Sequence, residues 1–251
     1  MTLSVEKASV IRSGKAILNA ASFACGVSGF TALCGPNGAG KSTAMSIMSG
    51  ALRADKGGAM LDGTAIRSFS SADLARRRAV VSQISMLTFP FEVHEVVAMG
   101  RAPHLGRSTP SEDLQIIGEA IKLMELTSLA ERRFTTLSGG ERQRVHIARA
   151  LAQIWEPPRD GATRWLLLDE PTAALDLKHQ LSLMRLLRRL ASEEGWGVVA
   201  VLHDLHLVNV YADAVVLFKN GEIIASGGTS SVLTNDRVQD VFELTEPYSL
   251  N

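Results

Sequence analysis

Short runs of apolar residues predict several β-strands along this chain. The runs are rich in β-branched and other apolar residues, and turn residues bound several of them. The expected strands lie at residues 3–11, 17–27, 30–34, 58–62, 79–83, 165–168, 197–202, 213–218 and 222–225. The last two are separated by Lys219-Asn220-Gly221, and Asn-Gly is a strong signal for a hairpin turn.

The middle of the chain has a helical periodicity instead. Leu114, Ile117, Ile121 and Met124 recur at spacings of three and four, as on the apolar face of an amphipathic helix. Further helices are expected at residues 41–52, 139–151 and 177–194. Strands that alternate with helices indicate a largely parallel, buried sheet, here with an antiparallel N-terminal and edge portion.

These elements predict a single α/β domain over residues 1–251. Its core is expected to comprise residues 1–83 and 154–251, and residues 84–153 are expected to form an inserted helical subdomain. A Pro-rich, charged insert at residues 156–164 precedes the strand at 165–168.

Composition narrows the class of protein. The 251 residues are 46% hydrophobic and 21% charged, which is typical of a globular chain with one large core. The 26 basic and 26 acidic residues balance, so nothing in the net charge favours nucleic acid, and no nucleic-acid partner is expected. The two cysteines, Cys25 and Cys34, make no disulfide framework. No signal peptide or membrane-length apolar run is found, and a cytoplasmic protein is expected.

A phosphate-binding loop is predicted between the strand at 30–34 and the helix that begins at Lys41. The segment matches G-x-x-x-x-G-K-[ST] in the structural context that this motif requires. Its backbone N–H groups and the helix N-terminus suit phosphate oxygens, Lys41 suits the β- and γ-phosphates, and the Ser42 hydroxyl suits Mg²⁺. The expected nucleotide-binding residues are Gly35, Pro36, Asn37, Gly38, Ala39, Gly40, Lys41, Ser42 and Thr43.

An acidic pair, Asp169-Glu170, ends the apolar strand at 165–168. Open α/β sheets bind ligands at the carboxyl ends of their strands, and two carboxylates there suit a cation that accompanies a nucleotide. We expect Asp169 to bind Mg²⁺ and Glu170 to polarise the attacking water. His203 follows the strand at 197–202 at the same expected edge, where it would orient water and the transferring phosphoryl group. The other five histidines are interpreted as structural or surface residues.

The signature sequence of the ABC ATPases resembles a segment of this chain, Leu137-Ser138-Gly139-Gly140-Glu141-Arg142-Gln143. The phosphate loop precedes it and Leu168-Asp169-Glu170-Pro171-Thr172 follows it, in the order of that family. The glutamine of the family's Q-loop corresponds to Gln83, its D-loop to Ala174-Leu175-Asp176, and its switch histidine to His203. The resemblance spans most of the chain and implies a P-loop NTPase fold with a RecA-like core.

The resemblance also implies how the residues act. Ser138 is expected to cap the helix that starts near Gly139, with the N–H groups of Gly139 and Gly140 forming a second anion site. In the family, two subunits associate head to tail, and each ATP lies between one subunit's Lys41 loop and the other's Ser138 helix. The implied catalytic residues are Glu170, His203 and Gln83, and the implied Mg²⁺ ligands are Ser42, Gln83 and Asp169.

One position departs from the family pattern. Members usually carry an aromatic residue, ahead of the phosphate loop, that stacks on adenine. Arg12 stands at about that place, and no tyrosine, phenylalanine or tryptophan lies close to it in the sequence. A guanidinium plane can also stack on a base, so Arg12 is the candidate adenine contact.

The resemblance extends to one group of importers. Met99-Gly100-Arg101-Ala102-Pro103-His104 resembles the ATPases that power uptake of metal chelates, and the 155–164 insert resembles haemin importers most. It implies an ATPase homodimer with two permease copies and a periplasmic substrate-binding protein, on the cytoplasmic face of a bacterial inner membrane. A ferric-siderophore or vitamin B12 importer is the alternative cargo class. A soluble ABC ATPase of iron–sulfur cluster assembly is the alternative of another class.

Overall fold

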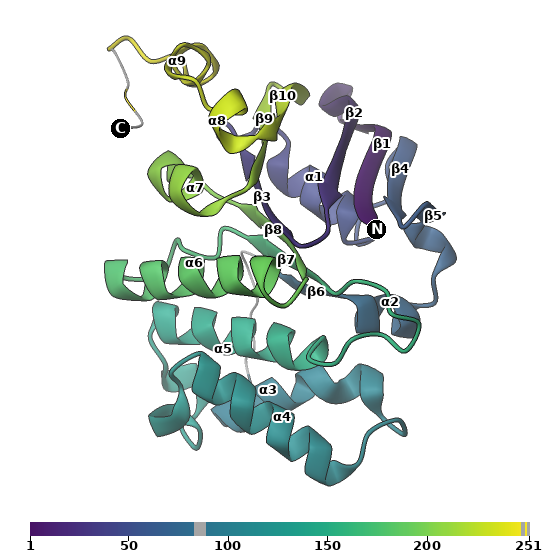
Figure 1. Cartoon of the computed structure of the whole chain (residues 1–251), viewed down its shortest axis with the longest axis vertical. Helices are drawn as coiled ribbons and strands as arrows, with labels where there is room; N and C mark the ends of the chain where they lie inside the picture. Colours follow the sequence, from purple (N-terminus) through teal and green to yellow (C-terminus); the bar gives the residue numbers. More distant parts are fainter. Residues whose placement is uncertain (83–88, 247–248, 250–251) are drawn as a thin grey trace. The chain divides into compact units, whose positions relative to one another are not determined.

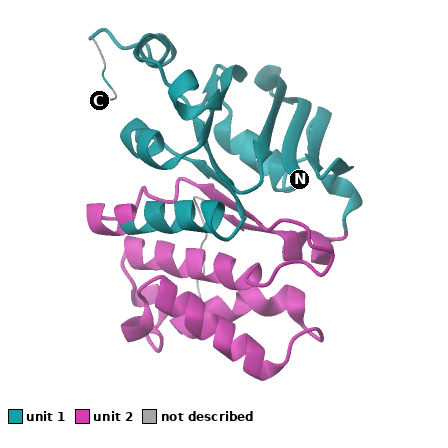
Figure 2. Cartoon of the chain, viewed as in Figure 1, with its two compact units in different colours: residues 1–69, 182–251 teal, residues 70–181 magenta. Residues whose placement is uncertain are grey.

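The chain divides by its internal contacts into two units. The computed structural model describes residues 1–82, 89–246 and 249, and Figure 1 shows the elements that they form. Unit 1 comprises residues 1–69 and 182–251, and unit 2 comprises residues 70–181 (Figure 2). The division into a core of 1–83 and 154–251 and a helical subdomain of 84–153 stays a prediction.

An antiparallel sheet forms the first part of unit 1. β1 (Thr2–Arg12) pairs with β2 (Lys15–Gly26) on one side and β4 (Lys56–Leu61) on the other, and β5 (Thr64–Ala65) pairs with β4. Apolar side chains at every second or third position of β1 are buried, and the residues between them are exposed or half-buried. This confirms the predicted antiparallel N-terminal portion.

Unit 1 also contains parallel strands. β3 (Gly29–Cys34) lies between β8 (Gly197–Val201) and β9 (Ala214–Lys219) and runs parallel to both. All of β8 and all but the first residue of β3 are buried, as a strand covered on both faces should be. β10 (Glu222–Gly228) returns antiparallel to β9 through Asn220 and Gly221, whose φ angles of 52° and 81° confirm the predicted hairpin.

The helices of unit 1 are short. They are α1 (Lys41–Met48), α7 (Leu205–Tyr211), α8 (Thr229–Val232), α9 (Asn235–Phe242) and the 3-10 turn η1 (Ile66–Ser68). α1 ends four residues before the predicted end at 52. Gly50 takes a φ of 76°, and the N–H groups of Gly50 and Leu52 bond back to the carbonyls of Ile47 and Ser46, which closes the helix.

Unit 2 is mainly helical. Its elements are α2 (Ser71–Arg77), β6 (Arg78–Val81), α3 (Val93–Ala98), η2 (Met99–His104), α4 (Pro110–Leu123), η3 (Thr127–Leu129), η4 (Phe134–Thr136), α5 (Gly139–Gln153) and β7 (Trp165–Asp169). β6 and β7 pair in parallel. α6 (Leu177–Ser192) begins in unit 2 and ends in unit 1.

The apolar face of α4 differs from the prediction at its first member. Ile117, Ile121 and Met124 are buried, together with Ile116 and Ala120. Leu114 is 70% exposed, so its assignment to the buried face is wrong. Leu114 is the fifth residue of the helix, which starts at Pro110 after the Thr109–Glu112 capping box, and the buried stripe begins two residues later at Ile116.

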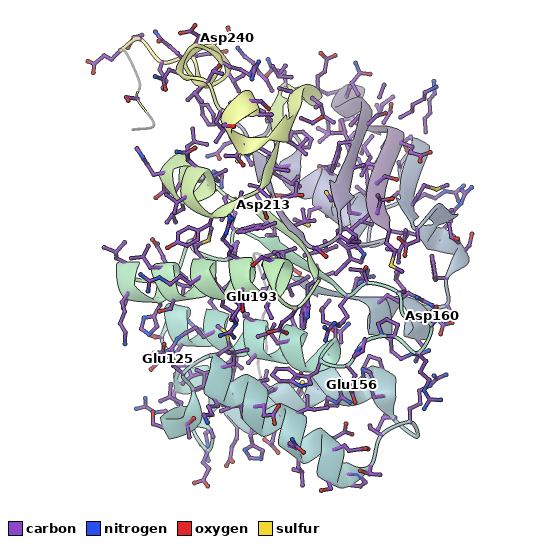
Figure 3. The ribbon with its side chains drawn as sticks, in the orientation of Figure 1. Glu125, Glu156, Asp160, Glu193, Asp213 and Asp240 are labelled. Atoms are coloured by element: carbon purple, nitrogen blue, oxygen red, sulfur yellow. The ribbon has the colours of Figure 1, made fainter. Side chains whose placement is uncertain are left out.

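Two ion pairs fix the insert before β7. Residues 155–164, all of which the structure describes, form neither helix nor strand. Asp160 accepts a hydrogen bond of 3.1 Å from Arg77 at the end of α2, and Glu156 lies 2.8 Å from the buried Arg101 of η2. Both acidic residues, Glu156 and Asp160, are labelled in Figure 3. The insert is therefore a loop tied down within unit 2.

No helix among the described residues is long and apolar enough to cross a membrane.

Candidate functional site

The phosphate loop connects β3 to α1 within unit 1. It begins at Gly35, directly after the buried Cys34, and Lys41 is the first residue of α1. Gly40 occupies the N-cap position with a φ of 101° and, being glycine, offers no side-chain cap to the helix. The first N–H groups of a helix have no partner inside it, so this end presents donors and a positive dipole to an anion.

Lys41 is folded into the loop. Its ammonium nitrogen donates hydrogen bonds of 2.7 Å to the Gly35 carbonyl and 2.8 Å to the Pro36 carbonyl, and the side chain is buried, with 5% exposed. Neutral carbonyl oxygens are modest partners for a buried charge, so an anionic phosphate suits this position better. The loop therefore fits a nucleotide's phosphates by donor chemistry and by charge.

His203 lies at the same edge of the sheet as the phosphate loop. β3 and β8 are parallel with Leu33 opposite Val201, and the Leu202 N–H donates to the Leu33 carbonyl at 3.2 Å. Gly35 lies two residues after Leu33, and His203 lies two residues after Val201. His203 is exposed and precedes Asp204, whose carboxylate caps α7. Parallel strands thus bring the two predicted segments to one edge.

The acidic pair belongs to unit 2. Asp169 is the last residue of β7 and Glu170 follows it, and both are half-buried. Glu170 has a φ of 51°, in the left-handed region that side chains other than glycine, asparagine and aspartate seldom adopt. Its carbonyl accepts a bond of 3.3 Å from the Ala173 N–H, which closes a turn after the strand. The backbone thus changes direction at Glu170.

The signature segment forms a capped helix start in unit 2. Ser138 is the N-cap of α5, as predicted: its hydroxyl accepts from the Glu141 N–H at 3.3 Å, and the Glu141 carboxylate accepts from the Ser138 N–H at 2.7 Å. The backbone N–H of Ser138 lowers the pKa of the Glu141 carboxyl group most of all, and the Ser138 side chain lowers it further. The capping box uses the N-cap and third N–H groups, which leaves those of Gly139 and Gly140 outside the helix's own bonding.

Gly140 also lies against the D-loop of the same unit. A Cβ atom at this position would lie 2.8 Å from the carbonyl oxygen of Ala174, closer than real Cβ contacts come. The signature helix and the residues after Glu170 therefore pack backbone to backbone. Asp176 ends this stretch and accepts from the His179 N–H at 2.9 Å, at the start of α6.

Arg12 is the last residue of β1 and lies in unit 1 with the phosphate loop. Its guanidinium is half exposed and lies 3.6 Å from the Asp55 carboxylate. Gln83 lies outside the described residues. Across the whole set, the phosphate loop, Arg12 and His203 belong to unit 1, whereas Ser138, Gly139, Gly140, Asp169 and Glu170 belong to unit 2.

Two features of the site are not visible in the sequence. One is the left-handed backbone of Glu170, because glutamate is not a residue that signals such a turn. The other is the position of the β9–β10 hairpin: Gly221 donates to the carbonyl of Ala39 in the phosphate loop at 3.1 Å. The Asn-Gly signal predicts the turn but not its neighbour, because Ala39 and Gly221 are 182 positions apart in the sequence.

Comparison with known proteins places the chain in a family. Residues 18–173 match the family model of the ABC transporter. The chain is 43% identical over 236 residues to the hemin import ATP-binding protein HmuV of Hahella chejuensis. The matched residues cover 94% of this chain and 90% of that protein. It is 46% identical over 203 residues to HmuV of Escherichia coli O157:H7, covering 81% of this chain and 77% of that protein.

Solved structures agree. A metal-chelate type ABC transporter in an inward-facing conformation matches with a TM-score of 0.80 and 30% identity over 97% of this chain and 89% of that chain. A dimeric ATP-binding cassette in a post-hydrolysis state with ADP and phosphate matches with a TM-score of 0.78 and 26% identity, over 90% of this chain and 98% of that chain. The predicted P-loop NTPase fold is thereby confirmed, and this chain belongs to the ABC transporter family, as one of its ATP-binding proteins.

Proposed function

We propose that this chain hydrolyses ATP to drive the import of haem through a partner membrane permease. The observation that carries the cargo is the likeness to HmuV, at 42–46% identity over most of the chain. The observation that carries the chemistry is the phosphate loop, in which a buried lysine follows a glycine that gives the start of α1 no side-chain cap.

The residues have the following proposed roles. Lys41 and the backbone N–H groups of residues 35 and 37–43 hold the phosphates, and Arg12 stacks on adenine. The Ser42 hydroxyl and the Asp169 carboxylate are oxygen donors of the kind that Mg²⁺ prefers, and Gln83 is the third proposed ligand. When bound, Mg²⁺ would neutralise charge on the phosphate oxygens. Glu170 takes a proton from the attacking water, and His203 orients that water and the γ-phosphate.

Two subunits complete two sites. The start of α5, with Ser138, Gly139 and Gly140, is a second place for an anion. We propose that it contacts the ATP held by the Lys41 loop of a second subunit, so that an isologous head-to-tail dimer closes on two ATP molecules. Gln83, between the proposed core and the proposed helical subdomain, would transmit this closure to the permease.

The proposed assembly comprises two copies of this chain, two copies of a permease and a periplasmic substrate-binding protein. This chain would be peripheral, on the cytoplasmic face of a bacterial inner membrane. Co-purification with the permease distinguishes a transport subunit from a soluble ATPase of iron–sulfur cluster assembly, which would be recovered without a membrane protein.

A growth experiment tests the cargo. Deletion of the gene should abolish growth on haem as the sole iron source and leave the use of ferric siderophores and vitamin B12 intact, and the wild-type gene should restore growth. A Lys41→Ala copy should fail to restore it, whereas a copy with the exposed Lys178→Ala should succeed. Normal growth on haem with loss of siderophore or vitamin B12 use would contradict the haem assignment.

A further inference from the structure

The turn of the β9–β10 hairpin is hydrogen-bonded to the phosphate loop. The N–H of Gly221 donates to the carbonyl of Ala39 at 3.1 Å, and the carbonyl of Gly221 accepts from the N–H of Asn19 in β2 at 2.8 Å. One residue of the turn therefore connects the phosphate loop to the antiparallel sheet. Figure 1 shows β10 beside β2 in this unit.

The junction has no room for a side chain. A Cβ atom on Gly221 would lie 2.8 Å from the carbonyl oxygen of Ile17, and a Cβ atom on Gly40 would lie 2.9 Å from the same oxygen. The latter would also lie 3.6 Å from the Cα of Gly221. Three stretches of backbone, from the loop, β2 and the hairpin, thus meet directly at Gly40, Ile17 and Gly221.

A side-chain bond fixes the hairpin to the sheet. The amide nitrogen of Asn19 donates to the carboxylate of Glu222 at 2.8 Å, one residue after the turn. With the backbone bond from Asn19, this gives the turn two attachments to β2. The hairpin is therefore a fixed support, and the loop residue that it holds, Ala39, lies two positions before Lys41.

We propose that the Asn220-Gly221 turn, held by Asn19, is a positioning element for ATP binding. Gly221 keeps Ala39 and Gly40 in the conformation that directs the Gly40 N–H and Lys41 at the phosphates. Hydrogen bonds to phosphate depend steeply on placement, so a displacement of a few tenths of an ångström at Gly40 weakens several of them together. The inference deepens the proposed function, since it concerns the residues that hold the nucleotide there.

The chain contains two matched controls for this turn. The β1–β2 and β4–β5 hairpins also have two-residue turns, Ser13-Gly14 with φ angles of 50° and 77° and Asp62-Gly63 with 51° and 75°. A Cβ atom at Gly14 or Gly63 meets no described atom within 4 Å. Alanine at Gly14 or Gly63 therefore carries the strain of a positive φ alone, whereas alanine at Gly221 adds the clash with Ile17.

The experiment compares Gly221→Ala with Gly14→Ala and Gly63→Ala. Affinity for MgATP is measured by calorimetry and the melting temperature by circular dichroism. All three variants should melt somewhat lower than wild type, and Gly221→Ala alone should raise the Kd for MgATP, by about tenfold. A Kd for Gly221→Ala equal to those of the controls would overturn the inference.

A second variant covers the case in which Gly221→Ala does not fold. Asn19→Ala removes the bond to Glu222 without adding an atom, and we expect it to raise the Kd for MgATP about threefold at an unchanged fold. If Gly221→Ala is unfolded and Asn19→Ala binds MgATP like wild type, the inference is wrong. Failure of wild type itself to bind MgATP would instead contradict the proposed function.

Discussion

Glu170 combines a strained backbone with the carboxylate that the proposed chemistry needs. Its φ of 51° persists because the turn to Ala173 and the packing of β7 fix the chain on both sides. Strain of this kind costs on the order of 1–3 kcal/mol, and it places the carboxylate just beyond the end of the strand.

The first prediction concerns this carboxylate. Glu170→Gln keeps the shape of the side chain but cannot take a proton from water, so turnover should fall by roughly two to four decades while MgATP still binds. Steady-state phosphate release and equilibrium binding measure the two effects. Glu193→Gln, at an exposed glutamate after α6, is the control and should behave as wild type. Near-normal turnover of Glu170→Gln would remove Glu170 from the role.

Arg12 provides a second test at the scale of one residue. If its guanidinium stacks on adenine, Arg12→Ala should raise the Michaelis constant for ATP several-fold with little change in turnover at saturation. The exposed Arg53 lies in the same unit, and Arg53→Ala should change neither constant. Equal Michaelis constants in wild type and Arg12→Ala would mean that the base is held elsewhere.

At the scale of an element, α5 and α4 begin in the same way. Thr109 and Glu112 form a capping box at α4, as Ser138 and Glu141 do at α5. In each box, a bond from the N-cap backbone N–H lowers the pKa of the glutamate. The chain therefore contains one capped helix start in the signature segment and a matched one outside it.

These two capping boxes predict that the stability of the fold depends on pH. A carboxylate whose pKa is lower in the folded state stabilises the fold above its ordinary pKa, and this stabilisation is lost as the pH falls through the folded value. Glu141→Gln and Glu112→Gln remove the charge, so each should lower stability modestly at pH 7 and change it little at pH 3, which flattens the loss of stability below the ordinary glutamate pKa. Urea unfolding between pH 7 and pH 3 measures this slope. A slope identical to that of wild type in both variants would contradict it.

The sequence predicts local features of these elements better than distant contacts. The Ser138 cap and the Asn220-Gly221 turn follow from residue types that act on their own backbone, and both are confirmed. The end of α1 and the exposure of Leu114 depend on how a glycine closes the helix and where a buried stripe begins, and there the predictions differ. The bond between Gly221 and Ala39 depends on the sheet, so local sequence contains no signal for it.

At the scale of the whole molecule, the two proposed anion sites belong to different units. The Lys41 loop belongs to unit 1 and the Ser138 helix to unit 2. Each has the donors and the dipole that favour a phosphate, so we propose that one chain offers two half-sites. In a two-fold dimer, the Lys41 loop of each subunit would meet the Ser138 helix of the other, so both half-sites of both subunits would be used.

Dimer formation is therefore expected to depend on ATP and on Ser138. In a Glu170→Gln background, MgATP should shift the protein from monomer to dimer, because the bridging nucleotide is not hydrolysed. Adding Ser138→Arg should prevent the shift, since a bulky cation would occupy the partner's phosphate position. Adding Thr109→Arg at the matched cap of α4 should leave the dimer intact. Light scattering after size exclusion measures the mass, and a dimer with Ser138→Arg would contradict the shared-site arrangement.

The burial of the two cysteines has a practical consequence for measuring movement of the two units by fluorescence. Cys25 and Cys34 are 1% and 0% exposed, and burial raises the pKa of each thiol to about 12. Since the thiolate is the reactive form, the native chain is almost silent toward maleimide dyes at neutral pH. Gly118→Cys on α4, where a Cβ meets no described atom within 4 Å, and Val210→Cys on α7, which is 64% exposed, would add one reactive thiol to each unit. Energy transfer between dyes at these two positions would then report the separation of the units during turnover, with no native thiol to remove first.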